Sequence, residues 1–345
     1  MRILVITQAL DLDHPVLGFF HRWVEELAGR VSSLQVIALS VGTYALPENV
    51  TVHSLGKEKR TQSPFIYALR FLSHAWALRN EYDVVFLHMN QEYVLLAGVM
   101  WKLLGKRVYL WRNHYAGSLL THLAAMWCNK VFYTSRHSYT ARFSNAERMP
   151  VGVDERITRS SEPRTPRSIL WLGRISPSKH LELFIDALAI LAARGVSYKA
   201  MIVGSPLPKD QIYYDAMRTR AVDLEGQITF CEGVPHHTTT RFFQTHEYVV
   251  NTSPSGMFDK TLFEAAAAGA IPLAVSDDWR DLVEDTRLSF PPIPDALAGC
   301  LESLLSLPEV ERQACATRVF SRVIPSHRVS VLVDALTAHM VTIEV

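Results

Sequence analysis

The clearest indication of the fold is the stretch Ser168-Ile169-Leu170-Trp171-Leu172-Gly173-Arg174-Ile175-Ser176-Pro177-Ser178-Lys179. It opens with an apolar run that is typical of a buried strand, and Gly173 follows as a turn residue. A helical pattern then ends at Gly195, and its apolar stripe consists of Leu181, Phe184, Ile185, Leu188 and Leu191. Parallel sheets with helices on their faces are built from strands that lead through such turns into helices.

The same alternation extends in both directions along the chain. Towards the C-terminus the further apolar runs are Lys199–Val203, Ile228–Cys231, Tyr248–Asn251 and Ile271–Val275. Towards the N-terminus they are Ile3–Thr7, Leu34–Ser40, Val84–His88, Val108–Arg112 and Val131–Thr134. The helical pattern between the first two of these carries a stripe of Phe20, Trp23, Val24, Leu27 and Ala28. The sequence therefore predicts an α/β protein with two doubly wound parallel sheets.

A polar, proline-containing segment without periodicity, Glu155–Arg167, separates the two sets of strands and is interpreted as a linker. The 345 residues also exceed one ordinary core. We therefore expect two Rossmann-like domains, 1–158 and 159–328, that face each other across a cleft. The remaining segment, 329–345, is expected to form a helix that could pack on either domain, including back onto the N-terminal one.

Composition and charge exclude several classes of protein. With 48% hydrophobic and 20% charged residues and no internal repeat, the chain is neither disordered nor a solenoid. Residues 1–160 carry 18 Lys and Arg against 12 Asp and Glu, whereas residues 161–345 carry 17 against 22. The positive first half suits an anionic partner, and an accidental imbalance between domains is the alternative. No cluster of basic and aromatic residues indicates nucleic-acid binding.

Cysteine spacing and hydropathy indicate the cellular compartment in which the protein is expected. The four cysteines lie far apart without a Cys-x-x-Cys spacing, so we expect buried thiols in a reducing compartment rather than disulfides or a zinc site. The N-terminal apolar run is too short for a signal peptide. The most apolar stretch, 94–104, is about half a membrane span and contains Lys102. The expectation is a cytoplasmic protein.

Two segments that follow strands offer groups for an anion. Gly173 would let a ligand approach the backbone closely, and Arg174 and Lys179 could flank one anion near the start of a helix. The alternative is a glycine turn with two cations in solvent. After Tyr248–Asn251, small residues and glycine lead into a helix that carries Glu264 beside an alanine-rich stripe. The N–H groups of such a helix start suit a diphosphate, and a buried Glu264 could accept two ribose hydroxyls.

In this order and spacing, the two segments resemble the donor half of glycosyltransferase family 4, whose members are retaining enzymes of the GT-B fold. Gly173, Arg174 and Lys179 match the family's first motif, and Glu264 matches the second Glu of its later Glu-x7-Glu motif. The segment 149–154 resembles the family's approach to the interdomain linker. Gly18 resembles the family's N-terminal glycine loop, which approaches the donor phosphates. The stretch 15–23 around it resembles a bacterial subgroup associated with cell-surface polysaccharide assembly.

The resemblance implies transfer of a sugar from a nucleotide-diphosphate sugar, most simply a UDP- or GDP-sugar, to a hydroxyl of a glycan or lipid-linked glycan, with no metal or other cofactor. Arg174 and Lys179 would stabilise the departing diphosphate, and His114 would be the polar group near the transferred sugar. The expected donor-binding residues are Gly18, Gly173, Gly204, Gly233, Gly256, Met257, Phe258, Asp259, Lys260, Thr261 and Glu264. Asp11, Asp13, Asp277 and Asp278 are interpreted as loop and capping carboxylates rather than metal ligands.

One position departs from the family pattern. Gly256 stands eight positions before Glu264, where the family has its first Glu. Contacts to the donor sugar are therefore expected from the backbone amides of Met257, Phe258 and Asp259, or from the Asp259 carboxylate. A complete loss of activity is the other interpretation of Gly256.

The acceptor is expected to bind to the N-terminal half, where His21, His88 and Asn90 are the candidate residues. A structural role is the alternative for each histidine. A helix that starts at Ser63 and Pro64 carries an apolar stripe that includes Phe65, Leu69 and Trp76, with Arg70 and Arg79 beside it. It is either a core helix or an interfacial helix at the inner face of the cytoplasmic membrane.

Three other functions remain open. A Rossmann-type oxidoreductase needs Gly-x-Gly-x-x-Gly after its first strand, but no glycine follows Ile3–Thr7 before Gly18. A sugar-nucleotide epimerase or hydrolase on the same fold would share the phosphate site without an acceptor. A non-catalytic sugar-nucleotide-binding scaffold would explain Gly256. The transferase is favoured because phosphate-site and ribose-site residues occur together.

Overall fold

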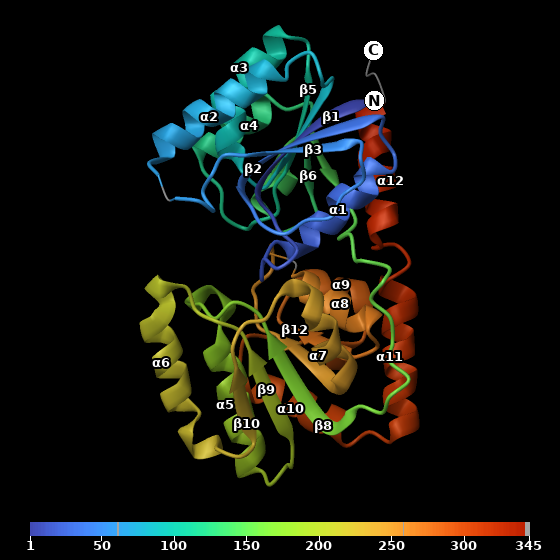
Figure 1. Cartoon of the computed structure of the whole chain (residues 1–345). Coiled ribbons are helices and arrows are strands. Elements are labelled where there is room, and N and C mark those ends of the chain that lie inside the picture. The colour runs from blue at the N-terminus through green and yellow to red at the C-terminus, as the bar shows by residue number, and fades with distance from the viewer. Residues whose placement is uncertain (61, 258, 342–345) are drawn as a thin grey trace. The chain divides into compact units, whose positions relative to one another are not determined.

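The computed structural model describes residues 1–60, 62–257 and 259–341, which divide into two compact units. The first unit contains Met1–Gly152, the short loop Pro235–His237 and the chain from Val329 onward. The second contains Val153–Val234 and Thr238–Arg328. Each unit is built on one parallel sheet with helices on both faces (Figure 1). The predicted α/β class with two doubly wound sheets is thereby confirmed.

Among the described residues, the sheet of the first unit has seven parallel strands in the order β3-β2-β1-β4-β5-β6-β7. They are β1 (Arg2–Leu10), β2 (Ser33–Val41), β3 (Val50–Ser54), β4 (Val84–His88), β5 (Arg107–Trp111), β6 (Lys130–Tyr133) and β7 (Ala146–Arg148). The helices are α1 (Gly18–Ala28), α2 (Pro64–Ala77), α3 (Gln91–Leu103), α4 (Leu119–Met126) and α12 (Val329–Val341). The strand order reverses between β1 and β4, so ligands are expected beyond the carboxyl ends of these two strands.

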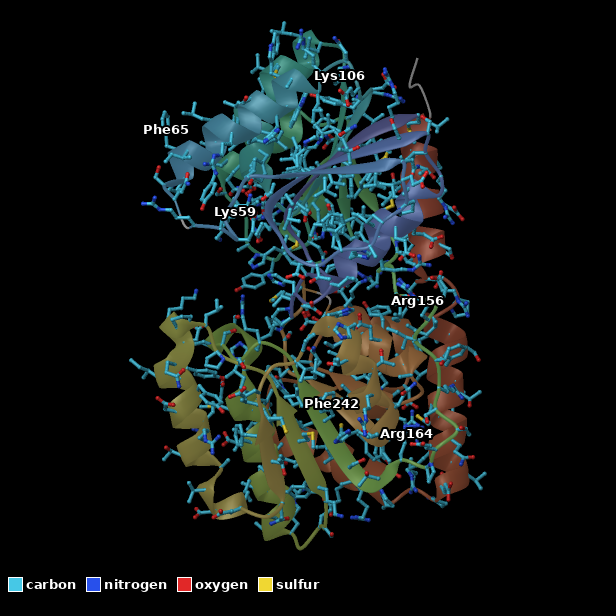
Figure 2. All side chains as sticks on the ribbon, viewed as in Figure 1. Lys59, Phe65, Lys106, Arg156, Arg164 and Phe242 are labelled. Carbon is cyan, nitrogen blue, oxygen red and sulfur yellow. The ribbon has the colours of Figure 1, made fainter. Side chains whose placement is uncertain are left out.

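Helices α2, α3 and α4 cover one face of this sheet (Figure 1). Helix α2 packs through Tyr67 and Phe71, whereas Phe65, Leu69 and Trp76 of the expected stripe are exposed. Phe65 points outward from α2 (Figure 2) and is 70% exposed. The helix is apolar on both sides, so the sequence period could not decide which side meets the sheet. None of the helices in the described part of the chain is long and apolar enough to span a membrane.

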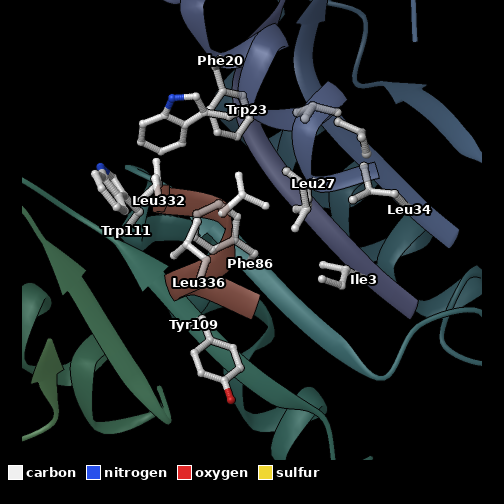
Figure 3. Packing of buried hydrophobic residues seen from close by; sticks show 14 of the residues in the cluster. Ile3, Phe20, Trp23, Leu27, Leu34, Phe86, Tyr109, Trp111, Leu332 and Leu336 are labelled. Atoms are coloured by element: carbon white, nitrogen blue, oxygen red, sulfur yellow. The ribbon is translucent and has the colours of Figure 1, made fainter. Parts of the chain in front are cut away.

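The opposite face of the sheet carries α1 and α12, whose packing is shown in Figure 3. The ring of Trp23 on α1 meets that of Trp111 on β5 edge-on, with 4.8 Å between centroids. The Trp23 Nε1–H donates to the carbonyl oxygen of Gly152 at 3.0 Å. Leu332 and Leu336 of α12 are buried in the same cluster. The last described helix therefore completes the core of the first unit.

In the second unit, the described residues form five parallel strands in the order β10-β9-β8-β11-β12. They are β8 (Thr165–Leu172), β9 (Lys199–Val203), β10 (Ile228–Cys231), β11 (His246–Asn251) and β12 (Ile271–Ala274). The helices are α5 (Leu181–Ala193), α6 (Gln211–Arg220), α7 (Thr239–Thr245), α8 (Lys260–Ala267), α9 (Asp277–Val283), α10 (Pro294–Leu305) and α11 (Glu309–Val323). The order reverses between β8 and β11, so the segments that follow these strands meet at the switch point of the sheet.

The segment before β8 is bound to the second unit along much of its length. The guanidinium of Arg159 donates to the carbonyl oxygen of Ala316 at 3.2 Å. That of Arg164 donates to the carbonyl oxygens of His246 at 3.0 Å and Ala268 at 2.6 Å (Figure 2). These contacts give fixed partners to a segment whose polarity alone predicted a linker.

The packing of α12 can be tested by truncating one buried side chain. We expect Leu336→Ala to lower the free energy of unfolding by about 2–5 kcal/mol, because the side chain is buried between α12 and the sheet. Val331→Ala, on the same helix but 37% exposed, should change it by less than about 0.5 kcal/mol. Urea unfolding followed by tryptophan fluorescence measures both, and equal effects would contradict the packing of α12.

Candidate functional site

Three glycine turns meet at the carboxyl ends of the neighbouring strands β8, β9 and β10. The N–H of Gly173 donates to the carbonyl oxygen of Val203 at 3.1 Å, and that of Gly233 donates to Ser205 Oγ at 2.9 Å. A Cβ atom on Gly204 would lie 2.0 Å from the carbonyl oxygen of Gly173. Any larger residue at position 204 would therefore push the β8 and β9 turns apart. The structure brings these three expected glycines together at the carboxyl ends of the strands.

A charged pair joins the segments that follow β8 and β11. Lys179 Nζ lies 2.6 Å and 2.8 Å from the two carboxylate oxygens of Asp259, and it donates to Ser253 Oγ at 3.1 Å. The carboxylate also accepts hydrogen bonds from Asn251 Nδ2 at 2.9 Å and from Ser253 Oγ. The side chains of Lys179 and Asp259 are only 14% and 18% exposed. Burial of both charges makes their mutual contact necessary.

The surroundings of Asp259 favour its ionised form. Burial acts to raise the pKa of this carboxyl group. The charge of Lys179 and the hydrogen bonds from Asn251, Lys179 and Ser253 outweigh burial, so the pKa of Asp259 lies below its ordinary value of 3.8. The pair therefore stabilises the fold above pH 3.8, and this contribution is lost as the pH falls through the lowered pKa.

Helix α8 begins directly after Asp259 and carries two further ionisable groups. Glu264 is 3% exposed and lies one turn after the half-buried Lys260. Burial lowers the pKa of Lys260 to about 8, although the charges of Glu264 and Asp154 act in the opposite direction. Thr261 Oγ1 accepts a hydrogen bond from Asn251 Nδ2 at 3.2 Å. The start of α8 thus combines backbone N–H groups with an amine that titrates near neutral pH.

The turn before α8 contains the position at which the sequence departs from the expected motif. Gly256 is buried with φ +91°, and its N–H lies 3.4 Å from a carboxylate oxygen of Asp278. Met257 is half-buried, and Phe258 lies outside the described residues. The Asp259 carboxylate, one of the two expected sets of sugar contacts, is already bound to Lys179, Asn251 and Ser253.

Arg174 follows Gly173 with an exposed side chain, and no hydrogen bond or ion pair engages it within the described residues. Arg174 and Lys179 therefore share no hydrogen-bond or ion-pair partner within the described residues. The Asp277 carboxylate, at the start of α9, accepts a hydrogen bond from Ser255 Oγ at 3.1 Å and pairs with Arg280 at 2.7 Å. Asp11 Oδ1 accepts the N–H of Thr43 in a loop. Across the described ranges, no group of three or more His, Cys, Asp or Glu could hold a metal ion.

In the first unit, polar residues of β1 and of the end of β4 lie beside each other at the switch point. His88 is 1% exposed, and its ring stacks on that of Phe20 with 4.0 Å between centroids. Its Nδ1 lies 3.5 Å from Thr7 Oγ1. Asn90 Oδ1 accepts a hydrogen bond from Gln8 Nε2 at 2.6 Å. These contacts place His88 and Asn90 at the carboxyl ends of β1 and β4. The His88 ring also packs in the core.

The other candidates of the first unit lie in loops and at helix starts. His21 is buried, and its Nε2 accepts the N–H of Ala45 at 3.1 Å, which is a structural contact. His114 follows β5 and is half-buried, with Nδ1 accepting the N–H of Ala116 at 2.9 Å. Gly18 is the first residue of α1, where a Cβ atom would lie 2.9 Å from the carbonyl oxygen of Leu12. Their roles towards a ligand stay predictions.

Asn251 and Ser253 are the functional candidates that sequence reasoning missed. Both contact Asp259, and the N–H of Ser253 also donates to Asn251 Oδ1 at 2.9 Å. The available signal was their place at the end of β11, beside the switch point, where polar side chains converge.

Neutralising Asp259 tests the charged pair. Asp259→Asn leaves Lys179 largely buried without its counter-charge, so we expect the free energy of unfolding to fall by about 3–5 kcal/mol at pH 7. The difference from wild type should shrink below pH 3.8, where the wild-type carboxylate also becomes protonated. Urea unfolding at several pH values measures this. The control is Asp186→Asn, which breaks a more exposed pair with Arg220 and should cost about 0–1 kcal/mol; equal losses in both variants would refute the buried pair.

Comparisons with known proteins agree with this geometry. Residues 166–307 match the family described as "Glycosyl transferases group 1". A GDP-mannose-dependent alpha-(1-6)-phosphatidylinositol dimannoside mannosyltransferase of Mycobacterium tuberculosis is 26% identical over 190 residues. That alignment covers 51% of this chain and 48% of the relative, so the chain spans about half the length of the curated relatives it matches.

Solved structures resemble the whole chain in fold. HepE from Anabaena, in complex with UDP and glucose, is 16% identical with a TM-score of 0.79, and the match covers 99% of this chain and 100% of HepE. Sucrose-phosphate synthase from Thermosynechococcus elongatus is 14% identical with a TM-score of 0.76 and 99% coverage of both chains. The matched family segment contains the glycine turns, Lys179 and α8. Residues 166–307 thus match the group 1 glycosyltransferases, and the chain as a whole has the GT-B fold.

Proposed function

We propose that the protein transfers a sugar from a nucleotide-diphosphate sugar to an acceptor hydroxyl, with retention of configuration at the anomeric carbon. The observation that carries this proposal is the arrangement at the β8–β11 switch point. A fixed lysine, the start of α8 and three glycine turns offer positive charge and close backbone approach, and Glu264 is buried one turn into α8. Such an arrangement fits a diphosphate with a ribose beside it.

In the proposed reaction, the bond between the anomeric carbon and the phosphate oxygen breaks while a bond to the acceptor oxygen forms. The departing diphosphate takes the proton of the acceptor hydroxyl on the same face of the sugar. Negative charge grows on the diphosphate during this step, so fixed cations and N–H groups lower the barrier. Lys179 and Arg174 are assigned to this role, and His114 is assigned to the sugar.

Asp259 is proposed as the residue that positions Lys179. Among the described residues, Lys179 Nζ contacts both carboxylate oxygens of Asp259 and the hydroxyl of Ser253. A diphosphate that approaches Lys179 can replace the neutral Ser253 contact and leave the ion pair intact. Gly256, which provides no carboxylate, leaves the donor sugar to the amides that follow it.

The substrates are proposed from chemistry and from the relatives. HepE was solved with UDP and glucose and the mycobacterial relative is named for GDP-mannose, which supports a UDP- or GDP-sugar as donor. The acceptor is proposed to be a glycan or lipid-linked glycan of bacterial surface polysaccharide assembly, bound by the first unit through residues near His88 and Asn90. We place the reaction at the cytoplasmic side of the membrane, where the protein would be a peripheral component.

A donor screen with variants tests the transferase. In a panel of UDP-, GDP- and ADP-sugars, a good donor at 100 times its dissociation constant should stabilise the protein by about 2.7 kcal/mol in thermal unfolding. Arg174→Ala should lower turnover roughly 10²–10³-fold without loss of folding, because it removes a cation from the departing diphosphate. Wild-type turnover in this variant would remove Arg174 from the mechanism.

Matched variants separate the transfer function from its alternatives. Arg241→Ala, another exposed arginine of the second unit, should leave turnover unchanged. For Lys179, the double variant Lys179→Met with Asp259→Asn avoids an unpaired buried charge and should also lose turnover. Release of free nucleotide without an acceptor would instead favour a hydrolase or epimerase. Donor binding without turnover across all acceptors would favour a scaffold.

The pKa of Lys260 predicts how donor affinity depends on pH. Since burial lowers this pKa to about 8, Lys260 loses its charge as the pH rises through 8. Affinity for the anionic donor should therefore fall between pH 7 and pH 9. Lys260→Met should bind more weakly at pH 7 and show a flatter profile in calorimetric titration. A wild-type slope in the Met variant would exclude Lys260 from donor binding.

A further inference from the structure

Exposed apolar side chains are concentrated on one part of the first unit. In the described chain, 23 large apolar side chains are exposed, and 12 of them lie on α2, α3 and α4 or directly after α3. They include Phe65 at 70%, Leu103 at 83%, Leu119 at 73% and Met126 at 76% exposure. Helix α3 contacts both α2 and α4, so these side chains form one surface, which we call the three-helix surface. Single exposed apolar residues are ordinary, but a continuous group marks an interaction site.

Helix α1, on the opposite face of the same sheet, carries charged side chains on the side that faces away from the sheet. Its outward residues are charged and paired, with Arg22 bound to Glu25 at 3.4 Å and to Glu26 at 2.5 Å. Helices α2, α3 and α4 instead direct apolar residues both to the sheet and to the outside. The inward residues alone, such as Phe71 and Trp101, fill the core. The outward ones therefore have no partner in the core of this unit.

Basic side chains flank the three-helix surface directly before α2, directly after α2 and in the last turn of α3. Residues 57–126 carry nine Lys and Arg against four Asp and Glu, although Arg107 and Arg112 lie on or directly after β5. Lys57, Lys59 and Arg60 are exposed directly before α2, where Figure 2 shows Lys59. Arg79 lies over the Trp76 ring at 4.4 Å, and Lys102 lies over the Trp127 ring at 5.3 Å. Cations whose stems follow apolar rings can keep their charged ends among polar head groups while the rings enter an apolar layer.

We propose that the three-helix surface binds an anionic phospholipid bilayer, with the outward residues of α2, α3 and α4 inserted at the boundary between head groups and acyl chains. The apolar residues supply the area that such insertion buries, and the surrounding Lys and Arg match the negative charge of the lipids. A neutral bilayer would interact with the apolar residues only. The inference builds on the membrane location proposed above but does not depend on the transfer reaction, because vesicle binding is measured without a donor and none of the proposed donor-site residues lies on α2, α3 or α4.

Vesicle flotation with the full-length protein tests the apolar part. The wild type should float with vesicles of phosphatidylglycerol and phosphatidylethanolamine. Phe65→Glu, Leu103→Glu and Met126→Glu, one on each helix, should each weaken binding at least roughly tenfold, because a buried apolar side chain is replaced by a charge. The matched controls are Ile212→Glu and Val310→Glu in the second unit, which change side chains that are 85% and 77% exposed and should bind as the wild type. Thermal unfolding with donor confirms that each variant is folded.

The charge dependence tests the lipid chemistry. Phosphatidylcholine vesicles and high salt should both weaken wild-type binding, and Lys59→Glu should weaken binding to anionic vesicles by more than about fivefold. The proposal is overturned if the wild type does not float, or if the three Glu variants float as well as the wild type. It is also overturned if light scattering shows a dimer that these variants dissociate while lipid binding is unchanged, since a second copy of the chain would then cover the surface.

Discussion

The ion pair of Lys179 and Asp259 determines the geometry of the donor half. Both side chains are more than four-fifths buried, and either charge alone would destabilise the fold by about 3–5 kcal/mol. The two residues come from segments that follow β8 and β11, so the pair holds these segments together at the switch point. Asp259 also directly precedes α8. The contact that neutralises Lys179 therefore also fixes where the N–H groups of α8 begin.

A second constraint is the close approach of the strand ends, which determines what can reach that pair. The absence of a Cβ atom at Gly204 lets the β8 turn lie against the β9 turn, and the N–H of Gly204 donates to the carbonyl oxygen of Cys231 on β10. The carboxyl ends of β8 and β9 therefore lie close together, with no side chain at Gly173 or Gly204. Charge and access come from different residues, yet both depend on the parallel register of one sheet.

The sequence predicted every strand with a continuous apolar run and missed the two edge strands of the first sheet. All ten apolar runs form strands, but β3 and β7 were not expected, because edge strands such as Val50–Ser54 are half-exposed and lack a continuous apolar run. Motif spacing marked Lys179 and Glu264. It did not predict that Lys179 would contact Asp259, 80 positions away, or that Asn251 and Ser253 would orient the carboxylate, since these contacts depend on which strands are neighbours.

In the first unit, the sequence could not predict which side of a helix is exposed. Helix α2 is apolar around most of its circumference, so its period is consistent with either side facing the sheet, and only the tertiary structure assigns Tyr67 and Phe71 to the core. Once that side is assigned, the outward residues need a different explanation, because a helix in water gains nothing from exposing Phe65 and Trp76. A lipid-linked acceptor would contact both the three-helix surface and the polar residues at the ends of β1 and β4. The bilayer would hold the lipid against α2, α3 and α4, while the polar residues after β1 and β4 would receive the glycan.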